Sequence, residues 1–268
     1  MRCLLVADLH YDLRKFDWVV AAAPYMDVVV IAGDHLDAAG VLGRPSQALV
    51  VQKYFRRIRE RAPLLVCSGN HDLDHRDLRG VMSTKWILRT RHYDVPTDGD
   101  ARLIGDTLFS SCPWSEGSLA WAQTVAQLER DAASRPARWV WIHHAPPMAS
   151  PVSWDGRRFY GQAELRALIE RYQPDIVLSG HVHQAPFTPV GSWADRIGAT
   201  WVFNAGYQAG PLPTHIVVEW GSDDAYWWSL AGAETLSLPG AAARPFPPVD
   251  EPPPWHVAIA RPAAPIPE

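Results

Sequence analysis

Histidine, aspartate and asparagine gather in short clusters, and each cluster directly follows an apolar run of the chain. The clusters are Asp8-Leu9-His10, Gly33-Asp34, Gly69-Asn70-His71-Asp72, His143-His144 and Gly180-His181-Val182-His183. Six of the eleven histidines of the chain belong to them. Carboxylate, amide and imidazole groups are ligands of divalent metal ions, and the same groups act as general acids and bases. Clusters of this composition indicate metal-assisted or acid–base chemistry.

Each cluster taken alone also has a purely structural explanation. Asn and Asp are common in turns, because their side chains bond the nearby backbone. A single buried histidine such as His143 is more often a hydrogen-bonded core residue than a ligand. His181 and His183 are harder to explain in this way, because residues two apart in an extended segment point to the same side. Coincidence at five run ends is implausible, so we expect one joint metal site.

The apolar runs predict the elements that position these clusters. Strands are expected at 3–7, 28–32, 64–67, 139–142 and 176–178, and helices at 46–61, 117–133 and 161–172. Continuous apolar runs of this length are typical of strands buried on both faces, and their alternation with helices predicts an α/β fold. In such folds ligands collect beyond the carboxyl ends of the strands. If the strands are parallel neighbours, the five clusters converge.

Further strands are expected at 200–203, 215–220 and 226–228, with the last two joined as a hairpin across 221–224. These strands follow one another without helices between them. They indicate a mixed sheet, or a second sheet packed on the first.

Composition limits the class of protein. The chain has 268 residues, 47% of them hydrophobic, which suffices for a sizeable core. The net charge of −4 provides no global basic field for nonspecific nucleic-acid binding. No apolar stretch approaches the length of a membrane span, and Asp8 interrupts the first run too early for a signal peptide. Cys3, Cys67 and Cys112 form no CxxC motif and are expected as free, buried or half-buried thiols. We expect a cytoplasmic protein without membrane partners.

The order of the five clusters resembles the calcineurin-like metallophosphoesterase superfamily. The resemblance spans residues 8–183, and Asn204-Ala205-Gly206 is similar to a later Asn-Pro-Gly motif of that family, with Ala in place of Pro. The fold it implies is a four-layer α/β/β/α sandwich, in which two mixed sheets are flanked by helices. The late strands agree with a second sheet.

The resemblance also implies a set of metal ligands. One ion would be held by Asp8, His10, Asp34 and His183, and the other by Asp34, Asn70, His143 and His181, so that Asp34 bridges the two. The fourth cluster offers two candidates, His143 and His144. We prefer His143, because it is closer to the end of the predicted strand, and keep His144 as the alternative.

Two divalent ions in such a site clamp the attacking and leaving oxygens of a displacement at phosphorus and generate a hydroxide nucleophile between them. Oxygen and nitrogen ligands suit manganese, iron, zinc or nickel without selecting one. His71 is not assigned to an ion and is expected to protonate the leaving oxygen as general acid. Asp72 is expected to orient the His71 imidazole and to keep it protonated.

The expected domain covers residues 1–238, with a basic insertion at about 73–98, and a Pro-rich arm or tail follows at 239–268. Ten of the thirty residues from 239 to 268 are proline, which excludes a regular helix or strand through this segment.

The expected activity is hydrolysis of a phosphoric ester, with a small molecule or nucleotide as substrate. The family resemblance favours a phosphodiester, while a phosphomonoesterase or protein phosphatase remains an alternative. A noncatalytic scaffold of the same fold is disfavoured, because every motif position is filled. Nucleic acid is possible as a substrate but not favoured, and the oligomeric state is left open. Arg157 and Arg158 could contact a phosphate and Tyr160 could stack on a base, although most such charges belong to solvated surfaces.

Overall fold

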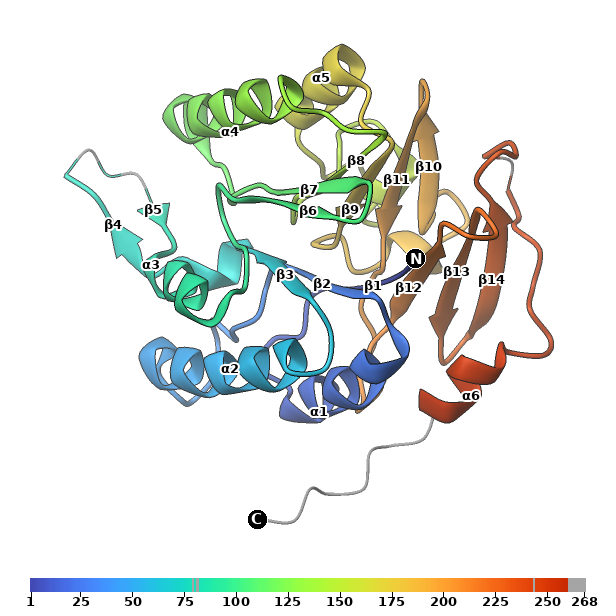
Figure 1. Cartoon of the computed structure of the whole chain (residues 1–268), viewed down its shortest axis with the longest axis horizontal. Helices are drawn as coiled ribbons and strands as arrows, with labels where there is room; N and C mark the ends of the chain where they lie inside the picture. Colours follow the sequence, from blue (N-terminus) through green and yellow to red (C-terminus); the bar gives the residue numbers. More distant parts are fainter. Residues whose placement is uncertain (79, 81, 243, 260–268) are drawn as a thin grey trace.

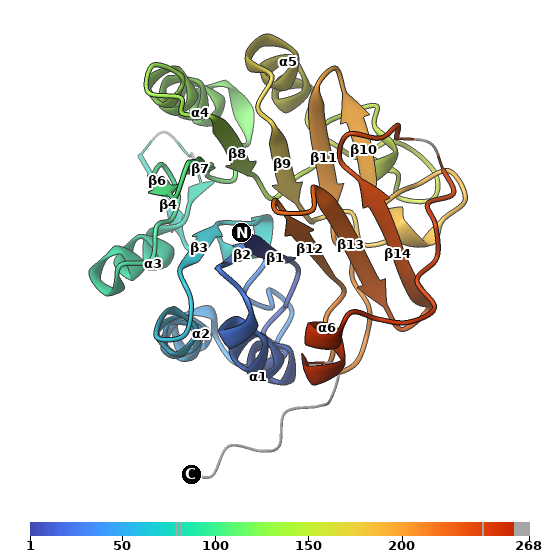
Figure 2. The same ribbon diagram turned by 45° about the vertical axis from the view of Figure 1, so that its right-hand side comes forward.

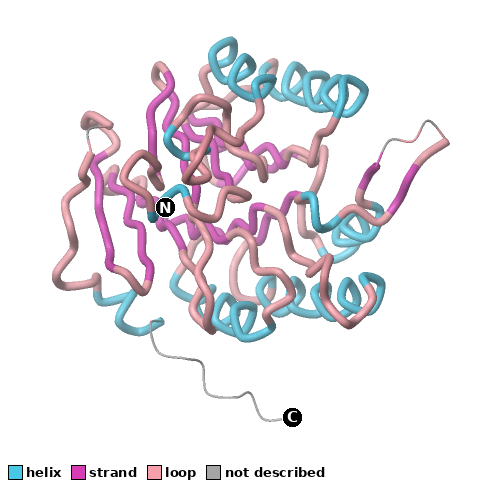
Figure 3. The backbone as a smooth tube through the Cα atoms, turned by 180° about the vertical axis from the view of Figure 1, so that it is seen from behind, coloured by secondary structure: helices cyan, strands magenta, loops and turns pink. Residues whose placement is uncertain are grey.

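Two six-stranded sheets stack face to face in the computed structural model, and helices cover the outer face of each (Figures 1 and 2). The structure describes residues 1–78, 80, 82–242 and 244–259. Seen from behind, the strands occupy the middle of the molecule between two helical layers (Figure 3). This arrangement confirms the predicted sandwich of two mixed sheets flanked by helices.

The first sheet has the order β14-β13-β12-β1-β2-β3. Its strands are β1 (Arg2–Val6), β2 (Val28–Ala32), β3 (Leu64–Cys67), β12 (His215–Glu219), β13 (Asp224–Ser229) and β14 (Gly232–Ser237). β1, β2 and β3 are parallel, whereas β12 to β14 form an antiparallel meander against β1. The carboxyl ends of β1 to β3 therefore meet at one edge.

The second sheet has the order β10-β11-β9-β8-β7-β6. Its strands are β6 (Ala101–Ile104), β7 (Thr107–Ser111), β8 (Arg138–Ile142), β9 (Ile176–Ser179), β10 (Ala194–Ile197) and β11 (Thr200–Asn204). β7, β8, β9 and β11 are parallel, and β6 and β10 are antiparallel edge strands. The five predicted cluster strands are thus divided between two sheets.

Alternate residues of the central strands serve two separate cores. Val29 and Ile31 of β2 pack toward the helices that cover the first sheet. Val28 and Val30 pack between the sheets, together with Val140 of β8. Burial on both faces explains why these strands consist of continuous β-branched residues.

Four helices form the outer layers of the sandwich. α1 (Leu13–Ala22) and α2 (Arg44–Arg59) cover the first sheet, and α4 (Gly117–Ala132) and α5 (Ala163–Tyr172) cover the second (Figure 1). Three of them match the predicted ranges within a few residues. α1 was not predicted; it begins after Asp12, whose carboxylate accepts a hydrogen bond from the backbone N–H of Arg14.

The 73–98 insertion contains a short hairpin of β4 (His75–Arg76) and β5 (Met82–Ser83), followed by α3 (Lys85–Leu88). The hairpin projects from the body of the molecule (Figure 1). Trp86 and Ile87 of α3 are buried in the core under α2, so part of the insertion belongs to the domain itself.

The Pro-rich segment runs back along β14 as far as the structure describes it. The backbone N–H of Thr235 donates to the carbonyl oxygen of Pro247, and the backbone N–H of Val249 donates to the carbonyl oxygen of Ala233. The segment ends in α6 (Pro254–Ile259), where His256 stacks on His215 with ring centroids 5.2 Å apart. The last nine residues of the predicted tail lie outside the described residues.

All three cysteines are free and buried, as expected from their spacing. Within the described residues, every helix is too short or too polar to cross a lipid bilayer. The cytoplasmic location expected from the sequence stays a prediction.

Candidate metal centre

The predicted clusters come together at the edge where the carboxyl ends of both sheets meet. Asp8, Asp34 and His181 each lie two residues beyond the last residue of β1, β2 and β9, respectively. Asn70 follows β3 at the start of η2 (Asn70–Asp72), a single 3₁₀ turn. The candidate ligands thus come from loops that two rigid sheets hold in place.

The backbone turns sharply at these positions. Asp8, His10, Asp34 and His181 all have positive φ angles, of 55°, 44°, 51° and 67°. This left-handed conformation costs a residue with a side chain about 1–3 kcal/mol. Glycine would avoid the cost but would supply no ligand, so the strain is consistent with side chains retained for function.

Two glycines are required because other groups approach them closely. Gly33 has a φ of 86°, and a Cβ on it would lie 2.5 Å from Nδ1 of His144. A Cβ on Gly69 would overlap the carboxylate and backbone nitrogen of Asp34. Gly69 itself is extended, with φ −111° and ψ −179°. Gly69 is therefore needed to let Asp34 come close, and not for its own backbone conformation.

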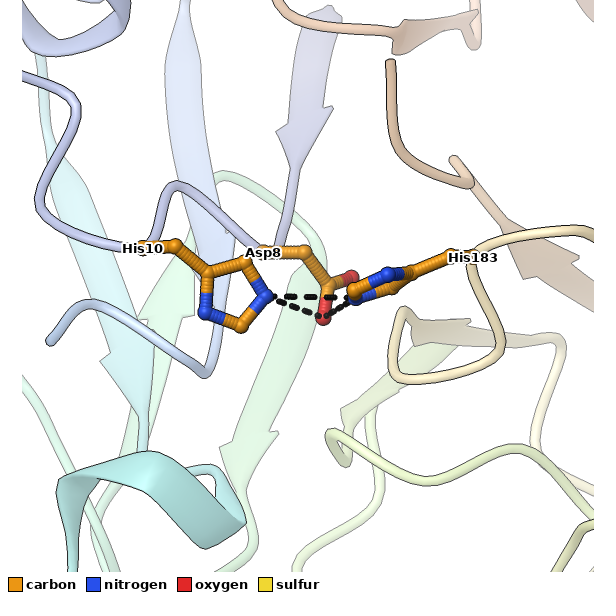
Figure 4. A group of neighbouring side chains, drawn as sticks. All are labelled: Asp8, His10 and His183. Carbon is orange, nitrogen blue, oxygen red and sulfur yellow. Dashed lines mark hydrogen bonds and ion pairs between the residues drawn. The ribbon is translucent and has the colours of Figure 1, made fainter. Parts of the chain in front are cut away.

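Asp8, His10 and His183 form the first cluster (Figure 4). Nε2 of His183 lies 3.2 Å from Oδ1 of Asp8 and 3.2 Å from Nε2 of His10. Nε2 of His10 lies 3.9 Å from Oδ1 of Asp8. Tetrahedral ligands bonded to one ion at about 2.0–2.1 Å lie roughly 3.4 Å from one another. The three atoms are spaced as the ligands of one ion would be.

Asp34, His144 and His181 form a second cluster, with all ligand atoms within 4.8 Å of one another. Oδ2 of Asp34 is 3.3 Å from Nε2 of His144. Asp34 also belongs to a third group, with His10 and His71. Because it faces both His144 and His10, Asp34 occupies the position expected of a bridging ligand.

The structure places His144, not His143, in the cluster. Trp139, Trp141 and His143 occupy alternate positions that face α4, where the His143 ring stacks on Trp121 at 5.4 Å. Nδ1 of His143 donates to the carbonyl oxygen of Ala145 at 2.8 Å. The preference for His143 is therefore corrected. The side chain closest to the strand end points to the wrong face of the sheet.

One unpartnered polar atom supports a cation site here. Oδ1 of Asn70 is buried without a hydrogen-bond partner, whereas Nε2 of His144 faces Oδ2 of Asp34 at 3.3 Å. Such orphaned atoms are uncommon in folded proteins and call for an explanation, for which a bound ion is sufficient. The donor set of carboxylates, imidazoles and one amide, with no thiolate, fits two divalent ions.

The carboxylates and imidazoles of the clusters shift one another's pKa values. Burial would raise the pKa of Asp8, but a hydrogen bond from His183 and the nearby histidine charges hold it below its usual value. Burial would lower the pKa of His144, but the Asp34 carboxylate raises it to about 9. Burial lowers the pKa of His181 to about 3. A ligating histidine must be neutral, so His144 would release a proton on binding a metal ion.

Asp72 does not contact the His71 imidazole. Its carboxylate is fully buried and accepts hydrogen bonds from Nδ1 of His35 at 2.9 Å and from the backbone N–H groups of His35, Leu36 and Gly69. The expected pairing of Asp72 with His71 is therefore corrected. Asp72 instead ties the β3–η2 loop to the loop after β2.

His71 lies at the opening of the centre. Its Nδ1 accepts a hydrogen bond from the backbone N–H of Ala38 at 3.3 Å, and its Nε2 lies 3.9 Å from Oδ2 of Asp34. Its backbone N–H donates to Oδ1 of Asp34 at 2.9 Å. The Nε2 edge of the ring therefore faces the clusters.

Aromatic rings, which the sequence analysis did not assign to the centre, cover its histidines. Tyr160 stacks on His181 and Tyr207 on His183, with ring centroids 5.2 and 4.8 Å apart. Nζ of the buried Lys15 lies 3.7 Å from the Tyr207 ring centroid and donates to the carbonyl oxygen of Gln208. These contacts restrict the rotation of the two histidines. Only the three-dimensional fold reveals them.

Paired metal-ligand clusters between two such sheets define a class of two-metal hydrolases, and comparison with known proteins gives the family. Residues 1–185 match the calcineurin-like phosphoesterases. The chain belongs to this family, whose members bind a dinuclear centre of divalent metal ions, and it is a metal-dependent phosphoester hydrolase. The resemblance expected from the sequence is confirmed.

Solved structures with low sequence identity share the fold. The protein TT1561 of Thermus thermophilus has a TM-score of 0.56 and 15% identity, over 88% of this chain and 98% of that one. A dimetal phosphatase from Danio rerio, LOC 393393, has a TM-score of 0.53 and 12% identity, over 85% and 95%. Purple acid phosphatase PPD1 from yellow lupin (Lupinus luteus) seeds has a TM-score of 0.54 and 14% identity, over 90% and 52%. No curated protein matches the chain.

Proposed function

We propose that the protein hydrolyses phosphodiesters at a centre of two divalent metal ions bridged by Asp34. The observation that carries the bridged metal pair is the shared position of Asp34, whose carboxylate belongs both to the group with His144 and His181 and to the group with His10 and His71; the choice of a diester follows the resemblance seen in the sequence. A carboxylate with ligands on both sides is what a pair of ions requires.

The proposed ligands follow the two clusters. Asp8, His10, Asp34 and His183 hold one ion, and Asp34, Asn70, His144 and His181 hold the other. Among the described groups, Asp8 and Asp34 supply the only carboxylates of the clusters, so about two positive charges of the pair remain uncompensated. This excess attracts the anionic phosphate of a substrate. Manganese, iron, zinc and nickel are all compatible with the donor set.

When bound, the two ions supply Lewis-acid activation of the phosphoryl group and of the attacking water. The residues of the chain fix the geometry for this step. Nδ1 of His144 bonds the carbonyl oxygen of Ala32, which leaves Nε2 free to ligate. His183 is held by Asp8 on its edge and by Tyr207 on its face.

His71 is the proposed general acid. Its Nε2 faces the clusters, where it can reach the leaving oxygen of an ester bound at the ions. To donate a proton from Nε2, the imidazole must also carry a proton on Nδ1. That second proton breaks the hydrogen bond that Nδ1 accepts from the backbone N–H of Ala38. The group that leaves is then a neutral alcohol rather than an alkoxide.

Hydrolysis assays after metal reconstitution test the proposal. Protein treated with EDTA and then loaded with Mn²⁺ is expected to hydrolyse bis-p-nitrophenyl phosphate faster than the monoester p-nitrophenyl phosphate. Asp34→Asn should abolish both activities, whereas Asp106→Asn, in the exposed β6–β7 turn, should leave them unchanged. Faster monoester turnover would refute the diester assignment. No turnover after loading with manganese, iron, zinc or nickel ions in separate experiments would refute the proposed activity itself.

A further inference from the structure

A stack of three side chains connects the surface to the proposed metal ligand His181. Tyr160, which is half exposed, stacks on the His181 ring with centroids 5.2 Å apart and planes inclined by 22°. The guanidinium carbon of Arg158 lies 5.3 Å from the Tyr160 ring centroid. The guanidinium is therefore only two ring contacts away from the metal centre.

The loop that carries this stack is well braced. Trp154 and Phe159 form an antiparallel bridge and pack ring edge to ring face at 5.1 Å. Oδ1 of Asp155 accepts hydrogen bonds from the backbone N–H groups of Arg157 and Arg158. The backbone N–H of Tyr160 donates to the carbonyl oxygen of Ser153 at 2.6 Å. These contacts fix the backbone from which Tyr160 and Arg158 project, so that binding a ligand there does not require the loop to become ordered.

The charge of the loop is not balanced. Its two arginines face one acidic side chain, Asp155, which lies 3.8 Å from Nε of Arg158 and uses its other oxygen for the backbone. No second carboxylate pairs with Arg158 in the described part of the chain. A planar guanidinium held on an aromatic ring suits bidentate binding of phosphate.

We propose that Arg158, held on Tyr160, forms a subsite for a second phosphate group of the substrate, outside the metal centre that holds the phosphate to be hydrolysed. The inference rests on the proposed function, because it takes the metal centre as the place of the first phosphate. It assigns the substrate to molecules with a second phosphate group, such as phosphorylated nucleotide esters. Simple diesters lack the group that this subsite binds.

Calorimetric binding to the Mn²⁺-loaded protein tests the subsite without requiring turnover. The probes are adenosine 3′,5′-bisphosphate and adenosine 5′-monophosphate, which differ in one phosphate. The wild type is expected to bind the bisphosphate about tenfold more tightly, as one charge-assisted contact provides. Arg158→Ala should remove this preference and leave monophosphate binding within about twofold. Arg158→Lys should retain part of the preference, because it keeps the charge but loses the planar fork.

Arg171→Ala provides the control, because Arg171 is an exposed arginine on α5 whose guanidinium pairs with Glu129. It should bind both probes as the wild type does. Equal affinities of the wild type for the two probes would overturn the subsite. An equal loss for both probes in Arg158→Ala would overturn it too, since it would indicate an effect on His181 through Tyr160. If the protein shows no hydrolysis but still binds the bisphosphate more tightly than the monophosphate, the proposed activity is refuted and the subsite is not.

Discussion

Nδ1 of His144 donates a 2.6 Å hydrogen bond to the carbonyl oxygen of Ala32, the last residue of β2. This bond joins the carboxyl end of a strand in one sheet to the loop after β8 in the other. It fixes the tautomer of His144, so that Nε2 faces Asp34. The metal centre thus depends on the packing of the two sheets, and not only on the loops that carry the ligands.

Replacing the two adjacent histidines separately should give different results. His144→Ala is expected to lose metal from the second cluster and to lower activity by at least about 100-fold, because it removes a ligand. His143→Ala should retain the metal but lower the free energy of unfolding by about 1–3 kcal/mol, because it removes a buried, hydrogen-bonded ring. Metal content, bis-p-nitrophenyl phosphate hydrolysis and urea unfolding measure these effects. Loss of metal in His143→Ala alone would restore the assignment made from the sequence.

Asp72→Asn should act on stability and not on proton transfer. The Asp72 carboxylate now accepts hydrogen bonds from Nδ1 of His35 and from the backbone N–H of Gly69. The NH₂ group of an Asn side chain would face these donors with donors of its own. We expect a loss of about 1–3 kcal/mol in the free energy of unfolding, as for buried donors left without an acceptor. The ratio of rates for good and poor leaving groups should stay the same in the folded variant. A changed ratio with unchanged stability would show that Asp72 acts through His71 after all.

Asp98 should make stability depend on pH. Burial raises the pKa of Asp98 to about 7, although a hydrogen bond from Ser68 opposes the shift. The folded state therefore binds a proton that the unfolded state has lost between about pH 4 and 7, and the contribution of Asp98 to stability falls as pH rises through this window. It is fully present below about pH 4.

Asp98→Asn removes this titration but keeps an oxygen that can accept from the backbone N–H of Ser68. The free energy of unfolding of the variant, minus that of the wild type, should increase by on the order of 3 kcal/mol from pH 5 to pH 8. Denaturant unfolding of both proteins across this range measures the difference. A difference that does not vary with pH would mean that Asp98 is ionised throughout.

His71→Ala should spare metal binding and slow esters of poor leaving groups more than p-nitrophenyl esters. A general acid contributes roughly 10²–10⁴-fold where the leaving oxygen needs a proton, and p-nitrophenolate needs little help. Steady-state rates on an alkyl diester and on bis-p-nitrophenyl phosphate, together with metal content, test this expectation. Equal losses on both esters would exclude His71 as the acid.

Much of the fold could be predicted because the central strands are buried on both faces and consist of continuous apolar runs. β7 escaped prediction because its sequence, Thr107–Ser111, contains buried serines; the hydroxyl of Ser110 bonds Asp131 of α4, a partner that no local pattern shows. α1 escaped because Lys15 interrupts its apolar face, although the fold buries it against Tyr207.

The convergence of these side chains was largely predictable from the order of their clusters, and the two expectations that proved wrong failed for physical reasons. An apolar strand does not show which face packs on the partner sheet, so the sequence could not decide between His143 and His144 by proximity to the strand. In the structure His144, like Asp8, Asp34 and His181, lies two residues beyond its strand, but the strand ends predicted from the sequence at 7, 32 and 178 do not show this regularity. The partner of Asp72 is His35, 37 residues away, and only tertiary structure brings the two together.

Calorimetric titration of EDTA-treated protein with Mn²⁺ tests the central claim, a pair of ions bridged by Asp34, most directly. The wild type is expected to bind two equivalents per chain, and Asp34→Asn should weaken both, because each ion loses the shared carboxylate. One equivalent in the wild type, or loss of only one of the two in Asp34→Asn, would contradict a bridged pair.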